Sequence, residues 1–249
     1  MRELPPDWIV PDWPVPTRVK AFVTTRNGGA SAGPYASFNL GLRVNDDPQT
    51  VGRNRALLRE YLPAEPRWLV QVHGNLVVNA DRVQQPVEAD AATSCSPDTV
   101  CAIMVADCMP VLLADRAGKV VAAAHAGWRG LAGGVIENTV KSMAVPPSEV
   151  VAWLGPAIGP VAFEVGADVR ETFVAQDPGA ASAFVDHKPG KWLADLFALA
   201  RRRLQAIGVA DIHGGGLCTV SDPRRFYSHR RDKITGRMAA LIWLDGRKA

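Results

Sequence analysis

Five short apolar runs in the first half of the chain constrain its fold more than any other feature. They predict strands near residues 67–72, 75–80, 100–106, 110–115 and 119–125. Runs of this length, bounded by turn residues, are typical of buried strands, and Gly118 predicts a hairpin-like turn between the last two. The regular strand–helix alternation of a doubly wound or barrel fold is missing. The sequence therefore predicts an α+β fold with layered, mixed sheets.

Helix signals lie on both sides of these strands. Asp47 followed by Pro48 predicts a capped helix start, and the apolar pattern continues to about Leu62. A second amphipathic pattern covers residues 190–207, with Gly208 as its expected C-terminal cap. The chain has 249 residues and no recognisable linker. We therefore expect one catalytic domain over residues 1–249.

Composition narrows the class of protein. Hydrophobic residues make up 47% of the chain and charged residues 21%, which is ordinary for a soluble globular enzyme. The formal net charge of +3 and the lack of a basic block argue against a nucleic-acid or membrane partner. No signal peptide or membrane-length apolar run is seen, so we expect a cytoplasmic protein. No protein partner is evident, and the four cysteines are expected to be free or ligating.

Three potential metal ligands lie where apolar runs end. His73 ends the run that starts at Trp68, Cys108 follows the run that starts at Val100, and His125 ends the run that starts at Val120. A thiolate and two imidazoles that meet at strand ends would make a three-ligand site with an open fourth position. An open position is typical of a catalytic metal rather than a structural one. We therefore assign His73, Cys108 and His125 as metal ligands and as the catalytic residues.

The residue types alone leave three chemistries open. The triad could hold zinc together with a water of lowered pKa. Alternatively, His125 could activate Cys108 as a covalent nucleophile, with Asp107 or another acid orienting the base. A single copper also fits a His₂Cys ligand set, although it is less expected than zinc. A multicopper oxidase fits poorly, because it needs roughly ten histidines and this chain has five.

A series of motifs follows a fixed order along most of the chain. It includes Thr24-Thr-Arg-Asn-Gly-Gly-Ala-Ser31, Gln71-Val-His73-Gly, Ala106-Asp-Cys108-Met-Pro110, His125-Ala-Gly-Trp-Arg-Gly130 and Arg225-Phe-Tyr-Ser-His-Arg-Arg-Asp232. The ordered set resembles the laccase-domain family, formerly called multicopper polyphenol oxidases. Members have been described as purine nucleoside phosphorylases with adenosine deaminase activity, and a bacterial branch as a peptidoglycan editing factor.

The resemblance implies a fold, a cofactor and a substrate class. The implied fold is a four-layer α/β/β/α sandwich, and the implied ligand set holds one zinc at His73, Cys108 and His125. The implied substrates are phosphate and a purine nucleoside such as adenosine, inosine, guanosine or methylthioadenosine. This chain departs from the family at Arg43, where His is usual, and at His229, where Tyr is common. Either departure would change substrate preference if its side chain reaches the pocket.

Phosphorolysis requires a site for an anion. Arg26 beside Gly28 and Gly29 is a candidate, because a guanidinium and exposed backbone N–H groups suit an oxyanion. Arg129, at an expected helix start, is a second candidate, and Arg230 is a weaker third. Each could instead serve only the surface or the packing. The same zinc could activate water for deamination at purine C6, with Asp107 as a proton shuttle or only as a structural cap.

Two other functions remain open at this point. The first is an amide hydrolase acting on peptidoglycan precursors, with the zinc water or Cys108 as nucleophile. The second is a non-enzymatic binding protein stabilised by zinc. That protein would need a fourth ligand, for which His229 or Cys218 are candidates.

Overall fold

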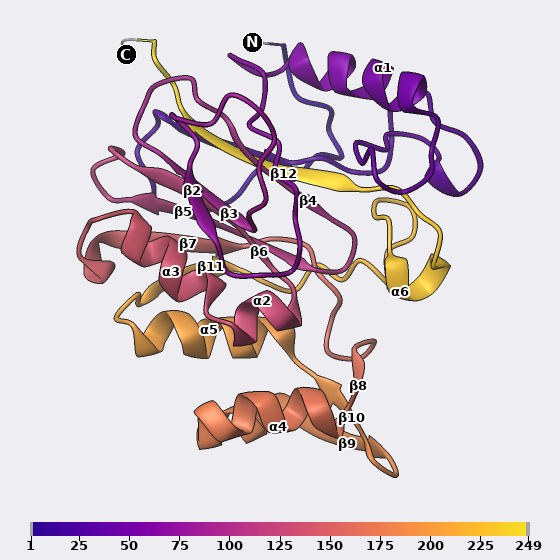
Figure 1. Cartoon of the computed structure of the whole chain (residues 1–249), viewed down its shortest axis with the longest axis vertical. Helices are drawn as coiled ribbons and strands as arrows, with labels where there is room; N and C mark the ends of the chain where they lie inside the picture. Colours follow the sequence, from indigo (N-terminus) through magenta and orange to yellow (C-terminus); the bar gives the residue numbers. More distant parts are fainter. Residues whose placement is uncertain (1, 248–249) are drawn as a thin grey trace.

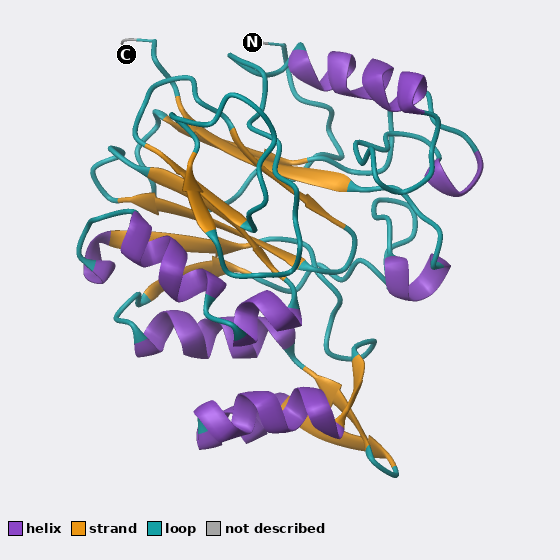
Figure 2. Ribbon diagram, viewed as in Figure 1, coloured by secondary structure: helices purple, strands orange, loops and turns teal. Residues whose placement is uncertain are grey.

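Two β-sheets stack face to face at the centre of the computed structural model, which describes residues 2–247 (Figures 1 and 2). The smaller sheet is antiparallel, in the order β1 (Val19–Val23), β12 (Met238–Leu244), β4 (Cys101–Val105). The larger sheet is mixed, in the order β11 (Asp211–Gly214), β7 (Val150–Leu154), β5 (Met109–Asp115), β6 (Val121–Ala126), β3 (Ala91–Ser94), β2 (Val77–Asn79). The mixed sheets confirm the predicted fold class.

Helices cover the outer face of each sheet. Helix α1 (Pro48–Arg59) packs on the smaller sheet, where Leu58 joins Phe22 and Leu241 in one apolar cluster. Helices α2 (Trp128–Ala132), α3 (Val135–Ser142) and α5 (Leu196–Ala206) lie on the larger sheet. The result is the expected four-layer α/β/β/α sandwich.

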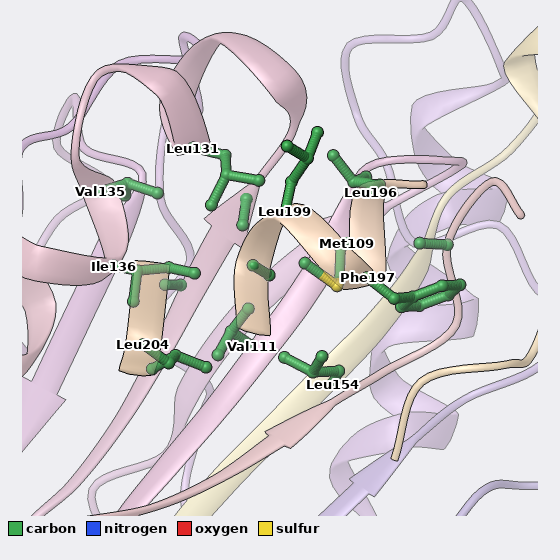
Figure 3. Packing of buried hydrophobic residues seen from close by; sticks show 14 of the residues in the cluster. Met109, Val111, Leu131, Val135, Ile136, Leu154, Leu196, Phe197, Leu199 and Leu204 are labelled. Atoms are coloured by element: carbon green, nitrogen blue, oxygen red, sulfur yellow. The ribbon is translucent and has the colours of Figure 1, made fainter. Parts of the chain in front are cut away.

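The central strands are buried on both faces. In β5, Val111 and Leu113 belong to the cluster beneath the helices, whereas Leu112 and Ala114 belong to the cluster between the sheets. Figure 3 shows Ile136 of α3 and Leu204 of α5 close to Val111. Because both faces of such a strand need apolar side chains, its sequence is a continuous apolar run rather than an alternating one. This burial explains why the apolar runs within residues 100–125 predict strands.

Several predicted elements are confirmed. β4, β5 and β6 match the expected runs, and Gly118 sits in the turn between β5 and β6 with φ +63°. Asp47 caps α1, since its carboxylate accepts a hydrogen bond from Thr50 N–H at 3.0 Å. None of the helices within residues 2–247 combines the length and apolar character needed to cross a bilayer.

Two predicted elements are wrong in part. Residues 67–72 form no strand and make only isolated bridges, Arg67 to Cys101 and Val70 to Glu88. The helix expected over 190–207 begins only at Leu196, because Lys191–Ala194 form β10. β10 pairs with β8 (Glu164–Gly166) and β9 (Phe184–Lys188) in a third sheet, which lies with α4 (Ala167–Gln176) beyond the helices of the larger sheet (Figure 2). Val169 and Phe173 of α4 belong to the same apolar cluster as those helices. Strand pairing here outweighed the helical pattern of apolar residues.

Candidate metal centre

The three predicted ligands converge at one end of the sandwich. His125 is the penultimate residue of β6, Cys108 lies in the turn between β4 and β5, and His73 lies in a loop. Their ligand atoms are all within 4.8 Å of one another, and the two imidazole rings meet edge to face at 68°. The group is therefore built from three separate segments of the chain, as expected.

The placement of His73 differs from the prediction. His73 does not end a strand; it is exposed and has φ +62°, in the left-handed region that residues with a β-carbon seldom adopt. Cys108 likewise follows a left-handed residue, Asp107, at φ +87°. Two of the three ligands are thus presented by sharply turned backbone and one by a regular strand.

The donor set fits a divalent ion of intermediate softness. Two imidazole nitrogens and one thiolate around a tetrahedral zinc would be separated by about 3.3–3.7 Å, which a small inward movement from the observed spacing would reach. Gly127 makes room for the sulfur, because a β-carbon there would lie 2.7 Å from Cys108 Sγ. Within residues 2–247, no fourth His, Cys, Asp or Glu joins the group. The arrangement is that of a three-ligand centre with one position open.

The electrostatics favour a thiolate at Cys108. Burial raises the pKa of the Cys108 thiol. The charge of His125 and the hydrogen bonds from His125 and His73 have the larger, opposite effect, so the pKa falls to about 6. Burial lowers the pKa of His125, but the thiolate and the carboxylate of Asp90 raise it to about 9. Both shifts favour a thiolate–imidazolium pair in the metal-free centre, and the thiolate is the form of Cys108 that binds metal.

A cavity of about 520 Å³ opens onto the three ligands. Its lining includes Arg43, Arg129, Arg230 and Arg237, none of which forms an ion pair with a carboxylate among the described residues. Asp107 is the one carboxylate of the lining. The cavity is consequently positive and suited to an anion.

Asp107 is held in a structural role. Its two carboxylate oxygens accept hydrogen bonds from the Thr219 hydroxyl and from Arg230 N–H, each at 2.6 Å. These bonds tie the C-terminal segment to the turn that carries Cys108. The contacts therefore favour the structural-cap interpretation of Asp107 over the proton-shuttle interpretation.

The three arginines predicted to bind substrate lie in different places. Arg129 and Arg230 line the cavity, with Arg129 over the Trp128 ring at 4.5 Å. Arg26 does not line it; its guanidinium donates to the carbonyl oxygens of Ala36 and Pro223, each at 3.0 Å. Arg26 thus joins two loops and is not placed to bind a ligand of this centre.

Both departures from the family pattern reach the cavity, since Arg43 and His229 are part of its lining.

Cys218, considered as a fourth ligand, lies outside the ligand group, and its sulfur accepts a hydrogen bond from Gly159 N–H at 3.2 Å. Neither candidate fourth ligand joins the centre. This finding argues against a purely structural zinc site within the described residues.

Sequence reasoning missed two residues of the site. Arg237 lines the cavity, and its guanidinium donates to the backbone carbonyl of Gly236 at 2.9 Å. Asp90, fully buried, contacts Nδ1 of His125 at 2.8 Å. The three ligands each follow an apolar run, whereas Arg237 and Asp90 do not, and the partners of these two residues at the site come from remote segments of the chain.

Comparisons with known proteins identify the family of the chain. The family model described as multi-copper polyphenol oxidoreductase laccase matches residues 20–245. A protein named purine nucleoside phosphorylase from Pseudomonas aeruginosa is 57% identical, over 96% of this chain and 98% of that protein. The Escherichia coli protein named purine nucleoside phosphorylase YfiH is 53% identical, over 95% and 98%.

Solved structures give the same result for the fold. A crystal structure of a Neisseria meningitidis protein is 52% identical, with a TM-score of 0.93, and covers 96% of this chain and 100% of that one. YlmD from Geobacillus stearothermophilus is 33% identical, with a TM-score of 0.84, over 92% and 93%. These chains share the sandwich along nearly its full length.

Proposed function

Because this chain belongs to the multi-copper polyphenol oxidoreductase laccase family, and relatives that match at least 95% of it are named purine nucleoside phosphorylases, we propose that it is a zinc-dependent purine nucleoside phosphorylase. The observation that carries the proposal is one open three-ligand centre at the base of a positive cavity. A volume of about 520 Å³ is within the usual range for a small-molecule pocket.

The family name suggests copper, but the donors of this chain favour a single zinc. The chain has five histidines, and two of them lie outside the centre in contact with carboxylates: His187 with Glu164 at 3.4 Å and His213 with Asp211 at 2.6 Å. No second cluster of donors is found among residues 2–247. Zinc bound here would act as a Lewis acid towards an oxygen of the substrate or of water.

The arginines of the cavity account for the use of phosphate. In phosphorolysis a phosphate oxygen bonds to C1′ of the ribose while the bond from C1′ to the purine nitrogen breaks, and its electron pair leaves with the base. Arg129, Arg230 and Arg237 supply guanidinium groups that hold the phosphate and balance its charge. We include adenosine, inosine, guanosine and methylthioadenosine as substrates, with adenosine deamination as a side activity of the same centre.

Product analysis over a nucleoside panel tests the proposal. Zinc-loaded protein is expected to release free purine and ribose 1-phosphate only when phosphate is present. Arg129→Met should raise the phosphate concentration at half-maximal rate by at least about tenfold, since a hydrogen bond to a charged group contributes about 1.5–3 kcal/mol. Arg116→Met, which loses only its exposed ion pair with Asp211, is the matched control and should behave as wild type. Purine release independent of phosphate would contradict phosphorolysis.

One observation favours a second function, an amide hydrolase that uses Cys108 as nucleophile. His125 contacts Cys108 through its ring and Asp90 through Nδ1 at 2.8 Å, so the three side chains form a nucleophile, a base and an orienting acid. The orienting acid is Asp90 and not Asp107. A catalytic triad of Cys108, His125 and Asp90 has no need of His73. A metal centre does need it, and His73 lies beside the other two ligands.

Alkylation separates the two functions. In metal-free protein, iodoacetamide labelling of Cys108 should increase with pH through about 6, because the thiolate is the reactive form and its pKa is lowered. Zinc should protect Cys108 fully, as judged by peptide mass spectrometry. Buried Cys101, whose pKa burial raises, is the internal control and should stay unlabelled. Stoichiometric labelling of Cys108 with zinc bound, together with loss of activity, would support the hydrolase.

A further inference from the structure

The carboxylate of Asp90 forms hydrogen bonds with both histidine ligands of the metal centre, although Asp90 is not itself a ligand. We propose that this one carboxylate is the positioning residue for both imidazole ligands: it holds His73 through the backbone and His125 through the ring. The inference rests on the proposed metal-dependent function and adds to it a residue that does not itself bind the metal.

The first half of the argument concerns His125. Asp90 directly precedes β3, which pairs antiparallel with β6, so the two residues are neighbours across the ladder and His125 N–H donates to the Asp90 carbonyl at 2.7 Å. The carboxylate then accepts from Nδ1 of the same residue at 2.8 Å. A proton fixed on Nδ1 leaves the lone pair of Nε2 free for a metal, which is how a carboxylate orients a ligating imidazole.

The second half concerns the loop of His73. Three consecutive N–H groups point at the Asp90 carboxylate: Val72 at 3.2 Å, His73 at 3.0 Å and Gly74 at 2.7 Å. Successive amides around a left-handed residue form a nest that binds an anion, and here the anion is part of the protein. The bonds offset the unfavourable φ of +62° at His73.

Other contacts hold the loop on either side of His73: the Gln71 side chain bonds the backbone of Met104, and the Asn75 side chain donates to the Gly133 carbonyl. His73 is exposed, so core packing does not fix its backbone, and within residues 2–247 Asp90 has no Lys or Arg partner that would account for its burial. Burial raises the pKa of Asp90, but the His125 and backbone hydrogen bonds lower it below its ordinary value, so the group is a carboxylate. Every hydrogen-bonding partner of that carboxylate therefore leads to one of the two imidazoles.

Asp90→Asn is the sharpest substitution. Oδ1 accepts from His73 N–H and His125 Nδ1, while Oδ2 accepts from Val72 and Gly74 N–H. An amide NH₂ group must face one pair of donors in either orientation, because all four partners donate. It either opens the nest or moves the His125 proton to Nε2. Both outcomes remove an imidazole from the centre without changing the volume of the side chain.

The measurement is zinc affinity of the full chain by competition with a chelating dye. We expect Asp90→Asn to bind zinc roughly 10- to 100-fold more weakly than wild type. Asp115→Asn is the matched control: Asp115 is also buried and accepts backbone N–H groups of Lys119 and Val120, at 2.6 and 2.8 Å, but its residue does not line the cavity. It should lose thermal stability while keeping the wild-type affinity. Affinity of Asp90→Asn within threefold of wild type would overturn the inference.

A second measurement needs no variant to fold. In wild-type protein loaded with zinc and labelled with ¹⁵N-histidine, His125 should show a protected Nδ1–H and a metal-bound Nε2. A metal-bound Nδ1 would overturn the role of Asp90 even if nucleoside turnover is confirmed. Wild-type protein that binds no zinc at all would overturn the proposed function together with this inference, so the two failures are distinguishable.

Discussion

Replacement of His125 by alanine is expected to abolish both zinc content and nucleoside phosphorolysis. The substitution removes one of three ligands and leaves Asp90 without its ring partner in a fully buried position. We expect zinc affinity to fall more than about 100-fold, beyond the effect of losing an outer-shell partner. Metal analysis of the purified protein and product detection from inosine with phosphate measure the two effects.

His213→Ala is the control for this experiment. His213 lies in β11, contacts Asp211 and does not line the cavity, so its loss should leave zinc content and turnover unchanged. Full turnover by a His125→Ala protein that contains no metal would refute zinc-dependent catalysis. Such a result would mean that the arginines of the cavity catalyse the reaction without a metal.

A single methyl group at Gly127 is expected to have nearly as large an effect. A β-carbon built there lies 2.7 Å from Cys108 Sγ, a separation that side chains do not tolerate, and 3.4 Å from His73 Cδ2. Gly127 has ordinary extended dihedral angles, so the alanine backbone is unstrained and the steric conflict alone acts. Rotation of Cys108 to relieve it takes the sulfur out of the centre. We expect zinc affinity to fall on the order of 10- to 100-fold.

Gly52→Ala gives the matched comparison, because it adds the same methyl group in open space on α1. Helix propensity predicts a gain in stability of about 0.5–1 kcal/mol for that variant, with zinc affinity unchanged. Chelator competition and thermal unfolding of both variants decide the matter. Equal zinc affinity for Gly127→Ala and wild type would show that Cys108 Sγ does not occupy the position given by the structure.

The parts of the fold that could be predicted from sequence are those determined by local patterns. β4 to β6 are apolar runs with a glycine turn, and Asp47 with Pro48 marks the start of α1. Residues 191–194 were mistaken for helix because a single turn of apolar residues has no distinctive period until its partner strands are known. Residues 67–72 have the apolar run of a strand but form only isolated bridges with other segments. At its end the run bonds to the Asp90 carboxylate through the N–H groups of Val72 and His73 instead of pairing with a strand.

The site shows the same division. His73, Cys108 and His125 were found because each has ligand chemistry and follows an apolar run. Arg26 has the right chemistry beside two glycines, but it does not line the cavity, and its guanidinium instead joins the backbone carbonyl oxygens of Ala36 and Pro223. Arg237 does not follow an apolar run and was given no role from the sequence, but it lines the cavity.

By itself the sequence determined the layered α+β class, the ligand types and the three segments that present them, because apolar periodicity and side-chain chemistry are local properties. Only the tertiary structure decided that Asp90 joins two of those ligands, that Gly127 makes room for the sulfur, and that Arg129, Arg230 and Arg237 rather than Arg26 face the cavity. These are contacts between segments distant in the chain. Their distances depend on how the sheets and loops pack, and this packing cannot be read from the residues adjacent in sequence.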